Sequence, residues 1–421
     1  MLYNLFIGKN IEKSKNVLFW TVASGIVYSL QSLVFLAVIQ QVLKDETAGI
    51  YSAGYVVASQ IFTIAKYCVR NYQVSDVKEK YSFDDYFSTR ILTCGIALIV
   101  SVAWVVIAGF NSQTVIVTLG LCVYKVADAF SDLFEGLYQQ KFRFDISGKS
   151  QCIKDVLMII QYVVMIIVTR NLVLSTVVLA VFSVLLVVIV DIPLSRKFVR
   201  WKFGINAGNV GCILAACFAL FVGSFAHQYI QQAPRYAIMG LPDTVGVPML
   251  AKFNELFMPT YMLYLFAGFT LKIWLTKLAV YHNEGNRKGF VSILYKQSLI
   301  IVILTILSSV GMYLLGGWML TLIYGTDLNG FQWFHVIIMI AGAFSAWYEL
   351  FESVLIIYRK QTFGICASIA SCGLAAIVLP FFVRHGGLMG AAVGYLVINA
   401  VRAAIYFVMA IIFMKKEKKE C

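Results

Sequence analysis

The feature that most constrains this chain is the succession of long apolar segments along its whole length. A helix needs about 20 apolar residues to cross the hydrocarbon core of a membrane, and only 13% of the residues are charged, against roughly 25% in soluble domains. We therefore predict an all-α integral membrane protein with about 12 transmembrane helices. The expected segments are 17–42, 48–69, 90–110, 114–137, 153–169, 172–193, 208–230, 246–270, 291–315, 332–357, 362–382 and 387–413.

Lysine and arginine are distributed unevenly among the connections between these segments. Of the 34 basic residues, 27 fall in one alternating set of connections that includes both termini, and four fall in the other set. Cytoplasmic connections are enriched in Lys and Arg, so we predict that both termini are cytoplasmic. The same rule explains the net charge of +13, so this charge does not indicate that the protein binds nucleic acid. The polar opening, Met1 to Asn16, leads directly into the first segment, and we expect no cleavable signal peptide.

A short acidic motif occurs twice. Asp132-Leu-Phe-Glu135-Gly136 recurs as Glu349-Leu-Phe-Glu352-Ser353, each time in the fourth segment of a six-segment half. We interpret this as a duplication that produced two parallel repeats. Transporters built from such repeats bind their substrate between the halves. The sequence therefore predicts two six-helix lobes, residues 1–203 and 204–421, joined by a basic connection at 196–202.

The fourth segment carries a stripe of four ionisable residues: Lys125, Asp128, Asp132 and Glu135. At about 100° per residue they fall within about 80° of one helix face. A charge at the centre of a bilayer costs about 2.5–3.5 kcal/mol on insertion scales, so the stripe should face a polar cavity or a partner helix. In the first case Lys125 would meet an anionic substrate, and Asp128 would pair with it or titrate. In the second, Lys125 and Asp128 form an i,i+3 pair within helix packing.

Other charged residues also lie within or beside apolar segments. Glu349 and Glu352 would form a cation or proton site, or would neutralise basic residues on neighbouring helices. Arg402 lies too deep in the last segment to reach the interface, so we expect a cavity or a glutamate partner. Lys252 and Glu255 repeat the i,i+3 pattern at the external end of the second half. Arg235 precedes them near Pro234 and Pro242, and Arg70 ends the second segment, where anion attraction and simple anchoring both fit.

The order and spacing of several motifs resemble the multidrug/oligosaccharidyl-lipid/polysaccharide (MOP, MATE-like) exporter superfamily, and within it the Wzx-type O-antigen and polysaccharide repeat-unit flippases. The resemblance extends over essentially the whole chain, but the external turn Met239–Gly246 differs from the usual family sequence. The motifs are Ala48-Gly-Ile-Tyr-Ser52, Phe134-Glu-Gly-Leu-Tyr-Gln-Gln-Lys-Phe-Arg143, Ser147-Gly-Lys-Ser150, Ala233-Pro-Arg-Tyr-Ala-Ile238, Leu256-Phe-Met-Pro259, Leu275 to Lys288, Tyr324-Gly325 and Gly386 to Gly394.

The resemblance implies a V-shaped transporter of the bacterial cytoplasmic (inner) membrane. It would move an undecaprenyl-pyrophosphate-linked oligosaccharide to the outer leaflet by alternating access, for O-antigen, capsule or other surface polysaccharide. Its partners would be this substrate, membrane lipids, H+ or Na+, and other polysaccharide-assembly proteins. The expected substrate-binding residues are Lys125, Arg402, Lys252, Arg235, Arg70 and Arg143. The expected ion-coupling or cavity carboxylates are Asp128, Asp132, Glu135, Glu349, Glu352 and Glu255.

Other functions remain alternatives. A cation-coupled antiporter or a lipid II flippase would share the same fold. A membrane-embedded glycan polymerase or ligase fits least well, because such enzymes usually need a sizeable external loop and the longest external connection here, about 231–245, is short. The sequence contains no P-loop, no H-E-x-x-H and no dinucleotide-binding loop, so we expect a transporter that is not an enzyme, with no cofactor and no metal centre.

Overall fold

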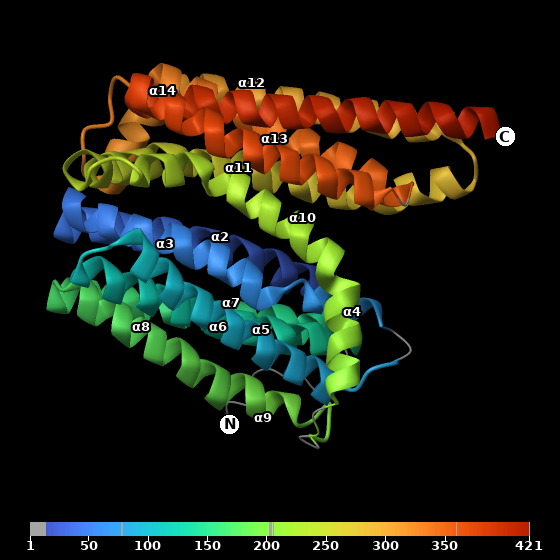
Figure 1. The fold of residues 1–421 in the computed structure, drawn as a ribbon, viewed down its shortest axis with the longest axis horizontal. Coiled ribbons are helices and arrows are strands. Elements are labelled where there is room, and N and C mark those ends of the chain that lie inside the picture. The colour runs from blue at the N-terminus through green and yellow to red at the C-terminus, as the bar shows by residue number, and fades with distance from the viewer. Residues whose placement is uncertain (1–13, 77–78, 202–203, 205, 359, 421) are drawn as a thin grey trace. The chain divides into compact units, whose positions relative to one another are not determined.

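The computed structural model of the protein describes residues 14–76, 79–201, 204, 206–358 and 360–420. The opening segment 1–13 and the basic residues Lys78, Lys202 and Arg359, which contribute to the predicted charge pattern, lie outside the described residues. Within those residues the regular structure consists of helices joined by short turns (Figure 1).

The helices follow the order of the apolar segments. The first ones are α2 (Ser14–Leu43), α3 (Asp45–Lys66), α4 (Val69–Ser75), α5 (Phe83–Ala108), α6 (Ser112–Gln140) and α7 (Phe144–Thr169). α8 (Leu172–Leu186), the π-helical turn η1 (Val187–Asp191) and α9 (Ile192–Ser195) then form one continuous span. α10 (Ala207–Met239), α11 (Asp243–Asn283), α12 (Arg287–Tyr324), α13 (Gln332–Ile357) and α14 (Gln361–Glu420) complete the chain.

The number and type of spans agree with the sequence. Among the described residues, ten helices are long and apolar enough to cross a membrane. One of them, in α14, covers the last two predicted segments, and its backbone leaves the helical region at Gly387, where φ is +55°. α11 lies outside these ten and covers the predicted segment 246–270. The prediction of an all-α, multi-pass membrane protein with about 12 spans is therefore confirmed.

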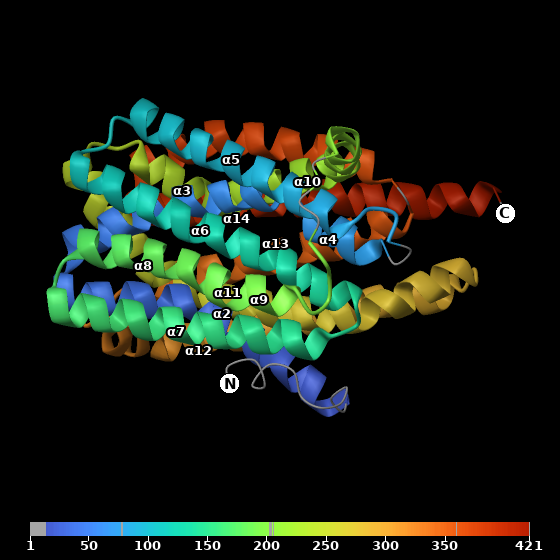
Figure 2. The same ribbon diagram turned by 90° about the horizontal axis from the view of Figure 1, so that it is seen from below.

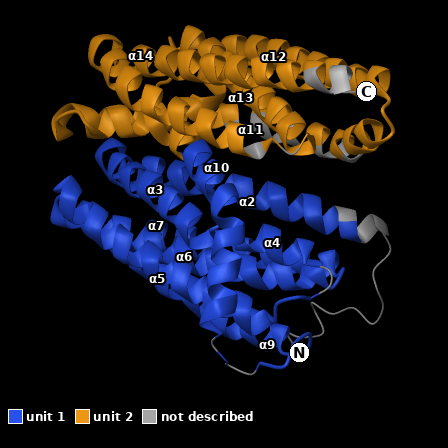
Figure 3. Ribbon diagram, turned by 45° about the vertical axis from the view of Figure 1, so that its right-hand side comes forward, with its two compact units in different colours: residues 1–228 blue, residues 229–421 orange. Residues whose placement is uncertain are grey.

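The chain divides into two compact units, residues 1–228 and residues 229–421 (Figure 3). α10 runs from the first unit into the second. The lobes predicted from the sequence, with their boundary between residues 203 and 204, stay a prediction.

Within the first unit, α6 is the central helix. It packs against α3, α5, α7 and α8 (Figures 1 and 2). Close approach depends on glycines: a Cβ at Gly54 of α3 would lie 3.1 Å from Leu121, and a Cβ at Gly120 would lie 2.9 Å from Thr176 of α8. Because helices surround α6, its charged stripe is enclosed by protein rather than by lipid.

The turn between α4 and α5 is organised by Asp76. Its carboxylate accepts hydrogen bonds from the backbone N–H groups of Lys80 (2.9 Å) and Tyr81 (3.1 Å) and from the Tyr86 hydroxyl (2.9 Å). Burial alone would raise the pKa of Asp76, but these hydrogen bonds outweigh it and hold the pKa below its ordinary value. The Gln140 amide donates to the Asp76 carbonyl at 2.8 Å, which fastens the end of α6 to this turn.

Candidate functional site

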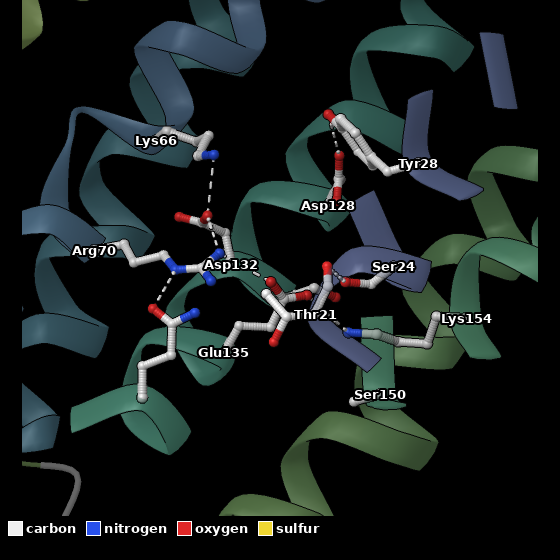
Figure 4. Close-up of polar contacts among 12 residues, drawn as sticks. Thr21, Ser24, Tyr28, Lys66, Arg70, Asp128, Asp132, Glu135, Ser150 and Lys154 are labelled. Carbon is white, nitrogen blue, oxygen red and sulfur yellow. Dashed lines mark hydrogen bonds and ion pairs between the residues drawn. The ribbon is translucent and has the colours of Figure 1, made fainter. Parts of the chain in front are cut away.

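The Asp132 carboxylate on α6 is the centre of a buried ion network in the first unit (Figure 4). It contacts Lys66 Nζ at 3.0 Å, an Arg70 guanidinium nitrogen at 2.9 Å and an Arg90 guanidinium nitrogen at 3.2 Å. These partners belong to α3, α4 and α5 respectively. Three cations around one carboxylate offset the cost of burying its charge.

Glu135, one helical turn further along α6, extends the network to α7 and η1. It contacts Arg70 at 2.9 Å and Lys154 at 3.8 Å. Lys154 in turn donates to both oxygens of Asp191, at 2.9 and 3.0 Å. Asp191 also accepts from the hydroxyls of Ser131 (2.7 Å) and Ser150 (3.4 Å). Two helices, α6 and α7, thus supply the hydrogen bonds that the fully buried Asp191 accepts.

The network carries a small excess of positive charge. Four cations (Lys66, Arg70, Arg90 and Lys154) face three carboxylates (Asp132, Glu135 and Asp191), which leaves one positive charge when all are ionised. Arg90 is fully buried, whereas 36% of the Lys66 side chain and 22% of the Arg70 side chain are exposed. The excess charge therefore reaches the surface of the unit at Lys66 and Arg70.

Lys125 lies two turns before Asp132 on α6 and is enclosed by aromatic rings. Its ammonium group is 4.8–5.5 Å from the ring centroids of Tyr28, Tyr55, Phe62 and Tyr124. It is 3.6 Å from the Asp128 carboxylate and 3.5 Å from the Tyr28 hydroxyl. Ring faces attract a cation most strongly where water is excluded, so this cage holds a buried positive charge that one carboxylate partly neutralises.

A small polar cavity adjoins the network. It has a volume of about 10 Å³, which is about the room that one water molecule needs, and it is bordered by α6, α7 and α8. Asp128, Glu135, Lys154 and Asp155 line it. Asp155 is only 2% exposed, and its Oδ2 atom accepts no hydrogen bond from the described residues. This carboxyl therefore faces a space in which a proton or a water molecule would be its partner.

In the second unit, Arg402 and Glu352 are joined through one tyrosine. The guanidinium carbon of Arg402 lies 3.3 Å from the ring centroid of Tyr348, and the Tyr348 hydroxyl donates to Glu352 at 2.6 Å. Arg402 is fully buried. Glu349, one turn earlier on α13 than Glu352, is half-buried, and its backbone carbonyl accepts from Ser353.

The remaining predicted residues of the second unit lie on α10 and α11. Arg235 is buried, donates to the Asn254 side chain and stacks 4.3 Å from the Phe257 ring. Glu255 accepts from the Thr326 hydroxyl at 3.1 Å. Lys252 lies 4.8 Å from the Phe331 ring. Lys252 and Glu255 thus both contact the connection between α12 and α13.

The structure brings together only part of the predicted set. Arg70, Lys125, Asp128, Asp132 and Glu135 lie along one face of α6 and its neighbours. Arg143 lies outside this group and pairs with Asp145 at 2.8 Å, at the start of α7. The predicted residues of the second unit form separate contacts within that unit. The substrate-binding and ion-coupling roles of all these residues stay predictions.

Sequence analysis does not single out three residues of the network, Arg90, Lys154 and Asp191, or Asp155 at the adjoining cavity. Arg90 and Lys154, at the starts of the expected segments 90–110 and 153–169, belong to the 27 basic residues grouped with the connections, yet both are buried inside helices. Asp155 and Asp191 were not considered, although Asp191 is a single carboxylate in the apolar segment 172–193. A search for isolated ionisable residues within apolar segments would have found Asp191. Among the described residues, no group of three or more His, Cys, Asp or Glu side chains is arranged to hold a metal ion.

Comparisons with known proteins place this arrangement in a known fold. Neither a protein-family model nor a curated protein matches the sequence. Among solved structures, the chain resembles an inward-facing multidrug resistance MATE family transporter of the MOP superfamily, with a TM-score of 0.67 and 11% identity over 97% of this chain and 99% of that one. It also resembles the lipid II flippase MurJ in an inward closed conformation, with a TM-score of 0.74 and 13% identity over 94% of this chain and 87% of that one.

These likenesses define the class of the protein by its fold. An outward-facing MATE family transporter is similar as well, with a TM-score of 0.62 and 13% identity over 99% of this chain and 98% of that one. The protein is a multi-pass membrane protein with the fold of MOP superfamily transporters such as MATE transporters and MurJ. The predicted resemblance to that superfamily is confirmed at the level of the fold, and the O-antigen flippase subtype stays a prediction.

Proposed function

We propose that the protein is a transporter that moves a polyprenyl-pyrophosphate-linked oligosaccharide across the bacterial cytoplasmic membrane for surface polysaccharide synthesis. The observation that carries this proposal is the net positive network around Asp132, which reaches the surface of the first unit at Lys66 and Arg70. A planar guanidinium beside an ammonium group suits a diphosphate, because arginine binds phosphate oxygens in pairs.

The buried acidic residues give this cationic site its shape. Asp132 and Glu135 both contact one guanidinium nitrogen of Arg70, each at 2.9 Å, so the side chain is held in one orientation before a substrate arrives. Lys125 adds a second positive charge about 10 Å away along α6. A binding site that is ordered in advance loses less entropy when its ligand binds.

The likeness to MurJ supports a lipid-linked substrate. That protein is a lipid II flippase, and its fold covers 94% of this chain. We propose the same general task here, with Asp128, Glu135 and Asp155 as the groups around the polar cavity that exchange an H+ or a Na+ during transport. Lys252, Glu255, Arg235, Glu349, Glu352 and Arg402 would contribute the corresponding groups of the second unit.

The test measures surface polysaccharide in a strain that carries only a variant of this protein. We expect Arg70→Gln, Lys125→Ala and Arg402→Ala each to lower surface polysaccharide about tenfold or more, because each removes a buried or partly buried cation to which we assign substrate binding in its own unit. Lys141→Gln is the matched control, since Lys141 is a basic residue in an exposed pair with Glu79. Protein amounts in the membrane must remain comparable. Normal polysaccharide in all three variants would contradict the assignment.

A cation-coupled antiporter is the second candidate. The observation in its favour is the group of carboxylates Asp128, Glu135 and Asp155 around the polar cavity, since these would also serve the coupling cation of such an antiporter. The similarity to MATE family transporters points the same way. Deletion of the protein separates the two candidates: altered drug sensitivity with intact polysaccharide favours the antiporter. Accumulation of an oligosaccharide-linked lipid inside the cell favours the flippase, and accumulation of lipid II would identify a lipid II flippase.

A further inference from the structure

An apolar groove runs between α6 and α8 of the first unit, away from the ion network. It has a volume of about 520 Å³, within the range of about 300–1,000 Å³ that small-molecule sites occupy, and its nine lining residues are all apolar. Ile116 and Val123 form its side on α6, and Val177, Val181 and Leu185 form its side on α8. These positions repeat every three or four residues, so each helix presents one continuous face to the groove.

Small residues make this region hollow. Gly120 of α6 lies so close to α8 that an added Cβ would be 2.9 Å from Thr176. Ala180, which is 6% exposed, forms part of the floor, whereas Val181 and Leu185 at the rim are 56% and 46% exposed. The two helices lie close together, with small residues at the floor of the groove and branched residues at its rim. The groove is therefore narrow and suits a flexible apolar chain. In lipid such a chain is held by van der Waals packing rather than by the hydrophobic effect.

Basic residues follow the α8 span. Arg196 and Lys197 come directly after α9 and are exposed. Arg196 is eleven residues beyond Leu185, which corresponds to about 16 Å at 1.5 Å per residue, and the groove continues for about 12 Å beyond Leu185 to Val177. One leaflet of the hydrocarbon core is only about 15 Å thick. Val177 thus lies about 28 Å from Arg196, whereas a leaflet with its head-group region is only about 20–22 Å thick. A lipid with its phosphate at Arg196 would therefore fill the groove as far as Val177 only if its chain extended beyond its own leaflet.

We propose that the α6–α8 groove binds the far part of the isoprenoid chain of an anionic polyprenyl lipid, with the lipid phosphate at Arg196 and Lys197. The positive charges of Arg196 and Lys197 complement the phosphate. The distance from these residues to the far end of the groove favours a long chain over the acyl chain of a phospholipid in the same leaflet. This inference rests on the proposed function and adds a binding site for the lipid part of the substrate.

The test uses the full-length protein in lipid nanodiscs and undecaprenyl phosphate with a photoreactive diazirine at the far end of its chain. We expect the label on α6 and α8 residues of the groove. Ala180→Phe fills the floor, and Val177→Phe fills the rim without changing the buried floor. Each should reduce this labelling about tenfold, which corresponds to about 1.4 kcal/mol. Val168→Phe, at a position of α7 that is 74% exposed and outside the groove, is the matched control.

Competition identifies the occupant. Unlabelled undecaprenyl phosphate should displace the probe, whereas farnesyl phosphate, which has the same head group and a short chain, should not. Equal displacement by farnesyl phosphate would overturn the length argument. The proposal also fails if labelling is spread over all spanning helices, if a chain-end diazirine phospholipid labels α8 equally well, or if a cysteine at Val181 crosslinks two copies of the protein efficiently.

Two outcomes distinguish a wrong groove assignment from a wrong proposed function. If the probe labels the protein but Ala180→Phe and Val177→Phe leave the yield unchanged, the groove assignment is wrong and the proposed function stands. If the wild-type protein takes up no probe while a MATE-type drug analogue binds, the proposed lipid-linked substrate is wrong as well.

Discussion

Buried ionic side chains in the first unit differ in how completely they are paired. Asp191 accepts hydrogen bonds from Lys154, Ser131 and Ser150, so its charge is well compensated. Asp155, beside Lys154 in the sequence, has an oxygen atom that accepts no hydrogen bond from the described residues. Under the proposed function, Asp191 is a structural carboxylate, and Asp155 is the carboxylate that would exchange a proton or a cation.

At this scale we predict that Lys154→Met destabilises the protein by about 3–5 kcal/mol, because it leaves Asp191 as an uncompensated buried charge. The measurement is thermal unfolding of the purified protein in detergent. Lys141→Met, which breaks the exposed pair with Glu79, should cost less than about 1 kcal/mol.

A second substitution tests the cause. Asp191→Asn in the Lys154→Met background removes the charge, while the amide oxygen still accepts from Ser131 and the amide NH2 donates to the Ser150 hydroxyl oxygen. At least half of the lost stability should therefore return. If the double variant is no more stable than Lys154→Met, the loss arises from packing and the electrostatic explanation is wrong.

Helical spacing explains which ionisable residues the sequence could group correctly. Lys125, Asp128, Asp132 and Glu135 share one face of a regular helix, so their helical spacing alone places them together. Arg90 and Lys154 are the first and second residues, respectively, of the expected segments 90–110 and 153–169, so the charge pattern groups them with the adjacent basic connections and does not show that they are buried. Their partners come from other helices, and no spacing within one segment gives those pairings.

At the scale of elements, glycine decides how closely two helices approach. A Cβ on Gly148 of α7 would lie 2.8 Å from the backbone of Trp20 in α2. Backbone atoms cannot move aside as a flexible side chain does. This contact holds α2 against the helix that carries Lys154 and Asp155.

We therefore predict that Gly148→Val destabilises the protein by about 1–3 kcal/mol through overpacking. Gly95→Val is the control, because a Cβ on Gly95 of α5 has no neighbour within 4 Å, and it should change stability by less than about 0.5 kcal/mol. Thermal unfolding compares the two variants. Equal melting temperatures for the two would show that α2 and α7 do not pack as closely as described.

Helix boundaries show where sequence reasoning was limited. We expected the third segment to begin near residue 90, but α5 begins at Phe83, where the Ser82 side chain and Asp85 form a reciprocal capping box. That motif is visible in the sequence. The segment that we expected to begin at residue 153 begins at Phe144 in α7. Its first turns are polar, and polar turns are helical where neighbouring residues satisfy their side chains.

At the scale of the whole molecule, the charge pattern predicts which ends of the helices face the cytoplasm. Cysteines introduced at Asn111, Asn171 and Asn329 should react with a membrane-impermeant maleimide in intact spheroplasts, since they lie in connections poor in Lys and Arg. Cysteines at Phe142, Arg196 and Glu284 should react only after the membrane is opened. The experiment uses a background without native cysteines, and labelling of both sets from outside would refute the predicted orientation.

The all-α membrane-spanning class and the approximate number of spans could be predicted from the sequence, because spans of about 20 apolar residues leave a membrane chain few alternatives to helices. The substrate could not be predicted from the residues in the same way. Recognition of a sugar or a diphosphate depends on a few side chains whose positions are set by packing between helices, and Lys66, Arg70 and Lys154 became informative only when their distances to Asp132, Glu135 and Asp191 were known.

The π-helical turn at Val187–Asp191 has a consequence for how this gene can vary. A π turn accommodates one residue more than an α turn, so the α8–α9 span contains an insertion relative to a regular helix. Loss of a single codon between 187 and 190 would turn the π turn back into an α turn and shorten the span by one residue. Asp191 would still face Lys154, because the π turn holds the extra residue locally and the residues after it would keep approximately their present orientation. The turn therefore marks a place where this gene could lose a codon without disconnecting the network.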